Sequence, residues 1–173
     1  MDLIPFPDKK YQVIYADPPW EYGGSMNETY GTSDKHYPTM PLDSICAFPV
    51  DDMAEDNAVL FLWATSPQLP EALKVIDSWG FEYKASFVWD KIKHVMGHYN
   101  SVRHELLFIA TKGSCTPEVM KLFDSVVTLE RTEHSAKPIV FREIIDTLYP
   151  SGNRIELFAR DKVPGWESYG NQL

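Results

Sequence analysis

The segment VIYADPPW, residues 13–20, is the most informative stretch of this 173-residue chain. Its first half, residues 13–16, is apolar or aromatic, which is typical of a short buried strand. The residue before a proline is disfavoured in a helix, and proline has no N–H for a sheet ladder, so we expect the strand to end at Asp17. Open α/β sheets bind ligands outside the carboxyl ends of their strands, so this position predicts a functional site that contains a carboxylate.

Strand-like and helix-like segments alternate along the rest of the chain, without an internal repeat or a low-complexity linker. We expect a helix from Ser66 to about Trp79, because Ser66 can act as an N-cap and Pro67 suits the first turn. Residues 21–40 and 91–103 have no clean period and predict surface loops. The other expected elements are strands at 57–65, 81–89, 105–110, 126–129 and 154–159 and a helix at 138–148. This alternation predicts an α/β domain.

The composition excludes several classes of protein. A chain of 173 residues with 44% hydrophobic content has the size of one domain, so we expect a single domain over residues 1–173. The longest apolar run, residues 58–64, is far shorter than the roughly 20 residues that cross a bilayer. The N-terminus does not resemble a secretory signal, so we expect no membrane segment and a cytoplasmic location. The two cysteines and five histidines lack metal-ligand spacing, and we expect no metal.

The net charge of −9 opposes the nonspecific attraction to phosphate that dominates most binding to nucleic acids. A local basic surface would be needed, and we assign it to Lys91, Lys93, His94 and Arg103, which lie close together in the sequence. A second subunit could complete the binding groove, which makes a homodimer plausible.

The DPPW motif, residues 17–20, suits the chemistry of an aromatic amine. Such an amine is a poor nucleophile because its lone pair is delocalised, so an enzyme must hold the N–H groups with acceptors that favour a pyramidal nitrogen. Asp17 supplies a carboxylate and Pro18 a carbonyl, while the fixed φ angles of Pro18 and Pro19 set their relative positions. Trp20 or Tyr22 can stack on the base, which must be unpaired or flipped out of a duplex. Taken alone, the motif also fits a proline turn that ends a strand and carries a surface aromatic.

Further segments make the chain similar to the MT-A70 family of adenine methyltransferases, which includes eukaryotic messenger-RNA enzymes and many bacterial and phage DNA enzymes. The matching segments, in family order, are residues 16–20, 60–65, 134–138, 154–160, 165–166 and 170–173. The resemblance implies a Rossmann-like class I methyltransferase fold, with a mostly parallel sheet and helices on both faces. It also implies that the catalytic motif precedes the cofactor-binding strand and that the cofactor is S-adenosylmethionine.

The resemblance also implies a set of cofactor contacts. Lys137 would contact the methionine carboxylate of the cofactor, and Glu156 would accept hydrogen bonds from the ribose hydroxyls. The implied site is completed by Phe158, by Arg160 beside the ribose, and by Asn171 and Gln172 on the adenine of the cofactor. The chain departs from the messenger-RNA members at Asp161 and Lys162, where those members have a His-Asn pair, so the ribose contacts of that pair are not transferred.

The leading hypothesis is a methyltransferase that acts on the 6-amino group of adenine in DNA. DNA is favoured over RNA because the chain carries no zinc finger or other RNA-targeting appendage. An RNA adenine methyltransferase with the same site is the first alternative. A noncatalytic scaffold subunit is the alternative from another class, but scaffold members have degraded catalytic motifs, whereas residues 17–20 are intact.

Overall fold

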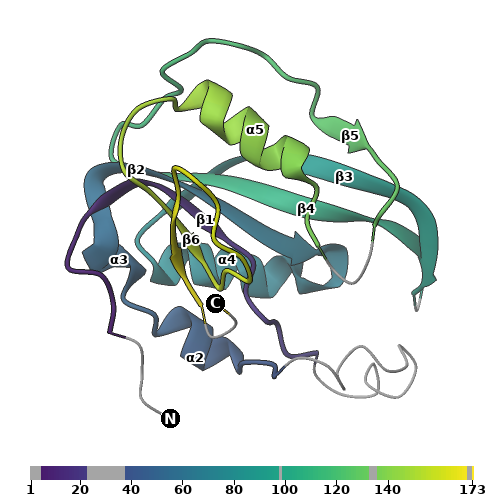
Figure 1. The fold of residues 1–173 in the computed structure, drawn as a ribbon. Helices are drawn as coiled ribbons and strands as arrows, with labels where there is room; N and C mark the ends of the chain where they lie inside the picture. The colour runs from purple at the N-terminus through teal and green to yellow at the C-terminus, as the bar shows by residue number, and fades with distance from the viewer. Residues whose placement is uncertain (1–4, 23–37, 98, 133–135, 171–172) are drawn as a thin grey trace.

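Seven strands form one sheet in the computed structural model, which describes residues 5–22, 38–97, 99–132, 136–170 and 173. The strand order is β5-β3-β4-β2-β1-β6-β7 (Figure 1). The strands are β1 (Tyr11–Ala16), β2 (Ala54–Thr65), β3 (Glu82–Met96), β4 (Ser101–Lys112), β5 (Val126–Thr128), β6 (Arg154–Leu157) and β7 (Glu167–Tyr169). Strand β4 runs antiparallel to β2 and β3, and the other neighbouring pairs are parallel. The predicted mostly parallel α/β sheet is confirmed.

Helices cover both faces of the sheet, as the class I fold requires. Helix α5 (Ile139–Leu148) lies on one face, and α2 (Leu42–Cys46), α3 (Val50–Met53) and α4 (Leu69–Ser78) lie on the other (Figure 1). Successive side chains of a strand point to opposite faces, so Tyr15 packs in the core beside α5 while Ile14 packs beside α4. None of the helices in the described ranges is long and apolar enough to cross a membrane.

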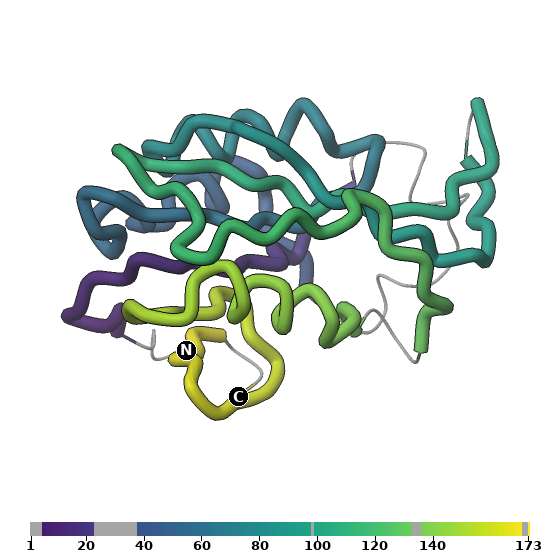
Figure 2. The backbone as a smooth tube through the Cα atoms, turned by 90° about the horizontal axis from the view of Figure 1, so that it is seen from above, coloured from purple at the N-terminus to yellow at the C-terminus, as the bar shows by residue number. Residues whose placement is uncertain are grey.

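The prediction of a surface loop at 91–103 is wrong. Strand β3 continues to Met96 and β4 begins at Ser101, so the two strands form a long hairpin whose end extends away from the body of the protein (Figure 2). The ladder is irregular between Asp90 and Val95, and Ile92 has a φ of 65°. Most side chains near this end are exposed, so the sequence lacks the polar–apolar alternation by which a half-buried strand is recognised.

The helix predicted from Ser66 begins with a different local structure. Residues Ser66–Gln68 form a 3₁₀ turn, and α4 follows from Leu69. The residue before the turn is Thr65 and makes no capping hydrogen bond with its side chain. The hydroxyl of Thr65 instead donates to the side-chain carbonyl of Gln68, 3.1 Å away. The short elements α2, α3 and β7 were not predicted from the sequence. Residues 23–37 of the loop predicted at 21–40 lie outside the described residues.

Removing the Phe141 side chain is expected to destabilise the fold strongly. Phe141 of α5 is fully buried, and its ring meets the Trp63 ring edge-on at 4.9 Å between centroids. We expect Phe141→Ala to lower the free energy of unfolding by about 3 to 5 kcal/mol, measured by urea denaturation with tryptophan fluorescence. Ile139→Ala on the same helix is the control, because Ile139 is 69% exposed and its loss should change stability by less than about 0.5 kcal/mol. Equal effects of the two substitutions would contradict this account of the core.

Candidate active site

Polar residues gather where the carboxyl end of β1 meets the ends of its neighbours. Asp17 follows β1 directly, and Thr65 is the last residue of β2. Thr65 pairs across the ladder with Glu105 of β4, and Glu105 pairs in turn with Trp89 of β3. Tyr15 and Trp63 lie in the core beside α5, so the alternation of side chains directs Asp17 and Thr65, two residues further on, to the same face.

Lys137 lies beside both carboxylates of this face, those of Asp17 and Glu105. It stands just before α5, its Nζ forms an ion pair with Glu105, and it lies 3.7 Å from Oδ2 of Asp17. The ammonium also lies 5.2 Å from the centroid of the Trp63 ring. Lys91 binds the other oxygen of Glu105 at 3.0 Å, so Glu105 holds two ammonium groups. All four charged side chains are at most 24% exposed, which keeps water from screening their interactions.

The surroundings shift the pKa values of Asp17 and Glu105 in opposite directions. Burial raises the pKa of Asp17, and the positive charge of Lys137 opposes this only in part. Burial alone would also raise the pKa of Glu105, but Lys137 and Lys91 outweigh it and hold that pKa below its usual value. Burial would lower the pKa of Lys137, yet the two carboxylates raise it. Lys137 and Glu105 therefore form an ionised pair. Asp17 has the higher pKa of the two carboxyl groups, as expected of a group that takes part in proton transfer.

The DPPW turn is held by hydrogen bonds on both sides. The backbone N–H of Trp20 donates to the Pro18 carbonyl, and the N–H of Met40 donates to the Pro19 carbonyl, both at 2.8 Å. The Trp20 indole N–H donates to the Trp63 carbonyl at 2.9 Å, and Trp20 is only 8% exposed. Trp20 is therefore an anchor of the turn, which corrects the expectation that its ring is available to a base.

Tyr22 is the aromatic residue that stays beside the charged group. Its side chain is half-buried, and its hydroxyl is hydrogen-bonded to the Thr65 side chain. Burial raises the pKa of Tyr22, and the negative charges of Glu105 and Asp17 raise it further. Tyr22 therefore lies close enough to Asp17 to be affected by its charge. Of the two aromatic residues expected to stack on the base, Tyr22 is better placed than Trp20.

A second polar group lies one strand away on β6. Glu156 pairs with Tyr15 across the β1–β6 ladder and forms an ion pair with Arg142 of α5. The Arg142 guanidinium lies over the rings of Tyr15 and Trp166, at 5.2 and 4.9 Å from their centroids. Arg142 was not predicted from the sequence, where it is only a charged residue next to the apolar positions of a helix.

Two buried polar atoms near Glu156 have no hydrogen-bond partner within the described residues. They are Nη1 of Arg142 and Oγ of Ser168, the residue of β7 that pairs with Glu156. Buried polar atoms in proteins are almost always satisfied, so water or a polar ligand beside Glu156 would complete these two atoms.

The other predicted cofactor residues follow β6. Phe158 has a φ of 58°, and its ring packs on Phe48 at 4.8 Å between centroids. Arg160 is close enough to Asp17 for its positive charge to lower the pKa of that carboxyl. A Cβ atom on Gly170 would lie 2.2 Å from the Ala159 carbonyl oxygen, so only glycine allows this close approach of the backbones. Asn171 and Gln172 lie outside the described residues.

The predicted phosphate-binding cluster is largely engaged within the protein. Lys91 is 8% exposed and bound to Glu105, which corrects its assignment to the nucleic-acid surface. Arg103 pairs with Asp90 at 2.6 Å, Lys93 pairs with Glu130, and Nδ1 of His94 lies 2.9 Å from the Ser101 hydroxyl. Lys93, His94 and Arg103 are exposed on the hairpin, and the acidic partners of Lys93 and Arg103 offset their positive charges.

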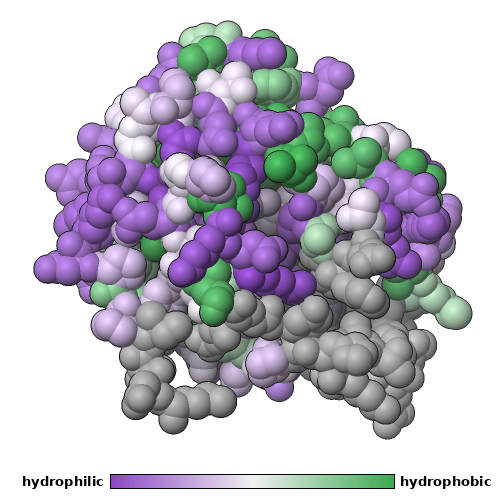
Figure 3. All heavy atoms as spheres, in the orientation of Figure 1, coloured by the Kyte–Doolittle hydropathy of each residue, from purple (hydrophilic) through white to green (hydrophobic). Residues whose placement is uncertain are grey.

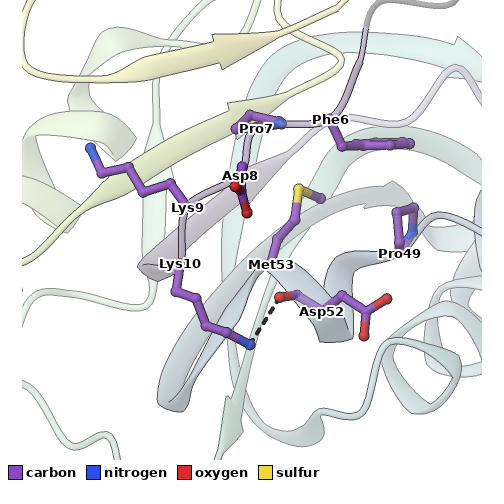
Figure 4. Close-up of a pocket in the computed structure, with 8 residues that line it drawn as sticks. All are labelled: Phe6, Pro7, Asp8, Lys9, Lys10, Pro49, Asp52 and Met53. Atoms are coloured by element: carbon purple, nitrogen blue, oxygen red, sulfur yellow. Dashed lines mark hydrogen bonds between the residues drawn. The ribbon is translucent and has the colours of Figure 1, made fainter.

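Two further surface features are a hollow near the N-terminus and a group of apolar side chains near α5. The hollow in Figure 4 is lined by Phe6, Pro7, Asp8, Lys9, Lys10, Pro49, Asp52 and Met53, which precede β1 and β2, and Lys10 reaches the Asp52 carbonyl there at 3.1 Å. Figure 3 shows a mostly hydrophilic face on which apolar side chains gather near the first turn of α5. No cluster of His, Cys, Asp and Glu suited to a metal ion occurs in the described part of the chain.

Comparisons with known proteins show what the chain is similar to. The chain is 36% identical over 185 residues to the type II methyltransferase M.MunI of Mycoplasma sp, an alignment that covers 96% of this chain and 79% of that protein. It is 30% identical over 174 residues to an N(6)-adenosine-methyltransferase MT-A70-like protein of Drosophila melanogaster and 27% identical over 175 residues to human METTL3, an N(6)-adenosine-methyltransferase catalytic subunit. These alignments cover 95% of this chain but only 27% and 28% of the two longer proteins. The MT-A70 family model matches residues 11–172, and the chain belongs to this family.

Proposed function

We propose that this chain is an S-adenosylmethionine-dependent methyltransferase that acts on the 6-amino group of adenine in DNA. The observation that carries the proposal is Asp17, a carboxyl group with a raised pKa in a rigid proline turn, beside the buried pair of Lys137 and Glu105. Membership of the MT-A70 family supports methyl transfer to adenine. DNA is preferred because the relative aligned over most of both chains is a type II methyltransferase.

The residues around β6 and α5 suit the cofactor. The vicinal hydroxyls of a ribose need acceptors, and Glu156 has one carboxylate oxygen outside its ion pair with Arg142. The Ser168 hydroxyl and Nη1 of Arg142, which have no partner within the described residues, would add two donors. Lys137 is proposed to bind the methionine carboxylate, which would join Asp17 and Glu105 as a third anion within its reach. S-Adenosylmethionine held by these residues would supply an activated methyl group bonded to a positively charged sulfur, which is a good leaving group.

The residues of the chain prepare the amine for this attack. Asp17 accepts one N–H of the adenine amine, and the Pro18 carbonyl accepts the other with the lone pair that the Trp20 N–H does not use. Two acceptors oppose delocalisation of the nitrogen lone pair into the ring. The raised pKa of Asp17 makes its carboxylate a better base for the proton that the nitrogen must lose. Tyr22 is proposed to stack on the base, which must leave a duplex to reach the turn.

One experiment tests polymer, base and position together. The purified chain is incubated with isotopically labelled cofactor and with matched DNA and RNA oligonucleotides, and the nucleosides are analysed by mass spectrometry. The proposal expects labelled N6-methyldeoxyadenosine. Label found only in RNA would favour the RNA methyltransferase. Absence of labelled nucleoside, together with absence of cofactor binding by calorimetry, would favour the scaffold alternative.

Substitution of Glu156 is expected to weaken cofactor binding. Glu156→Gln removes the charge that strengthens hydrogen bonds to the ribose, so we expect the Kd for S-adenosylmethionine to rise about tenfold to a hundredfold in calorimetry. Arg154→Met is the matched control, because it breaks the other ion pair between β6 and α5, with Asp146, and changes no residue assigned to the cofactor. If the two variants lose affinity equally, the effect belongs to the loss of an ion pair between β6 and α5, and if the Kd of Glu156→Gln is unchanged, Glu156 does not bind the cofactor.

The proposed partner is nucleic acid, bound by residues 1–173 acting as one methyltransferase domain. A homodimer remains part of the proposal, because the net charge of −9 and the internal pairing of Arg103 and Lys93 leave little basic surface around the hairpin of one chain. Sedimentation with and without an oligonucleotide tests the dimer. The cytoplasmic location stays a prediction.

A further inference from the structure

Gln68 is a buried polar residue beside the proposed active site that the mechanism does not use. It ends the 3₁₀ turn after β2 and is 6% exposed. Its side-chain Oε1 accepts from the Thr65 hydroxyl, while its Nε2 is buried without a partner within the described residues. Turning the amide by 180° would exchange the two atoms, so either way one end of the amide lacks a partner. A buried amide is rarely left in this state unless a ligand or water completes it.

Gln68 is connected to the catalytic group through Thr65. The Thr65 hydroxyl links Gln68 to Tyr22, and Thr65 is the cross-strand neighbour of Glu105. Tyr22 in turn feels the charges of Glu105, Lys137 and Asp17. The unpartnered amide therefore belongs to the same edge of the sheet as Asp17.

The strand order shows on which side of Asp17 this group lies. Strand β1 stands between β2 and β6 (Figure 1), so Gln68 lies on the β2 side of Asp17, and Glu156 lies on the β6 side. The residues proposed for the ribose of the cofactor are on β6 and its neighbours, whereas Lys137, proposed for the methionine carboxylate, lies beside Asp17 and Glu105. The β2 side, with Tyr22 and Thr65, is left for the target base.

The chemistry of adenine matches an amide donor at this place. The 6-amino group lies between two ring nitrogens, N1 and N7, and both are hydrogen-bond acceptors. Asp17 and the Pro18 carbonyl are acceptors and can bind only the amine, so a donor is still needed for the ring. We infer that the Gln68 amide donates a hydrogen bond to a ring nitrogen beside the target amine and thereby helps to select and orient adenine. This inference rests on the proposed function.

The test removes the two partners of this hydrogen bond separately and together. An oligonucleotide that the wild-type chain methylates is prepared with the target adenine replaced by 1-deazaadenine or 7-deazaadenine, each of which has C–H in place of one ring nitrogen and keeps the amine. We expect kcat/KM of the wild type to fall about tenfold to a hundredfold on one of the two analogues, which identifies the nitrogen. Gln68→Leu should lose a similar factor on adenine and lose almost nothing further on that analogue.

Controls separate this role from a structural one. Gln12→Leu makes the same change near the amino end of β1 and should leave the response to both analogues as in the wild type. Gln68→Glu keeps the shape and removes the donor, so it should repeat the pattern of Gln68→Leu if the leucine variant does not fold. Full activity of both Gln68 variants on adenine, or undiminished sensitivity of both to each analogue, would overturn the inference while the methyltransferase stands. A wild type that methylates no oligonucleotide would instead refute the proposed function, and the inference with it.

Discussion

Asp17→Asn is expected to lower kcat for methyl transfer by about a hundredfold to ten-thousandfold while cofactor binding is retained. Asparagine has nearly the same shape, but its amide is a weak base and presents an N–H where the carboxylate presents an acceptor. Asp17 is assigned to the amine of the target, and Lys137 and Glu156 are assigned to the cofactor, so the Kd for S-adenosylmethionine should change little. Single-turnover rates with labelled cofactor and calorimetry measure the two effects separately.

The same substitution is expected not to reduce stability. The folded-state pKa of Asp17 is raised, mainly by burial, so its ionised form is disfavoured by folding at every pH above that pKa. Asparagine cannot ionise, and Asp17→Asn should therefore unfold at the same temperature as the wild type or a higher one at neutral pH. Asp43→Asn is the control, because Asp43 is 92% exposed in α2 and should alter neither rate nor stability. Retained turnover in Asp17→Asn would contradict the proposed role, and a large loss of stability would show that Asp17 is structural.

The sequence predicted the parts of the site that depend on local backbone rules. Two prolines after an apolar run require the strand to end at Asp17, and this argument needs no knowledge of the rest of the fold. The alternation of elements predicted the sheet, the helices α4 and α5 and the edge at which a ligand would bind. Lys137 and Glu156 came from the resemblance to the family, because a lysine before a helix and a glutamate in a strand are by themselves common.

The parts that were missed depend on contacts between distant segments. Glu105 becomes important only when β2 and β4 pair, since this places it opposite Thr65 and within reach of Lys137. Lys91 looked like a surface cation because its neighbours in sequence are basic, but Glu105 draws it into the sheet edge. The burial of Trp20 depends on the carbonyl of Trp63 on another strand. No local pattern contains these contacts, so the sequence could predict the turn that carries Asp17 but not the charges that surround it.

Lys137→Met is expected to affect stability, cofactor binding and the pH dependence together. Lys137→Met removes the ammonium nearest to Asp17 and one of the two that bind Glu105, while Lys91 still binds Glu105, so the free energy of unfolding should fall by about 1 to 3 kcal/mol in urea denaturation. Lys137 is also assigned to the methionine carboxylate of the cofactor, so the Kd for the cofactor should rise about tenfold to a hundredfold. Lys84→Met is the control, because Lys84 is 48% exposed and pairs with the exposed Glu82, a contact that contributes less than about 1 kcal/mol.

The pH dependence distinguishes the electrostatic role of Lys137 from simple loss of binding. In the proposed mechanism methyl transfer needs ionised Asp17, so kcat at saturating cofactor should decrease as the pH falls through the pKa of that group. The positive charge of Lys137 lowers the pKa of Asp17, and removing it should move this decrease to higher pH. The negative charge of Glu105 raises the same pKa, so Glu105→Gln should move the decrease to lower pH. Shifts of opposite sign follow only if both charges act on Asp17 through space, whereas shifts in the same direction, or none, would mean that the group controlling the rate is not Asp17.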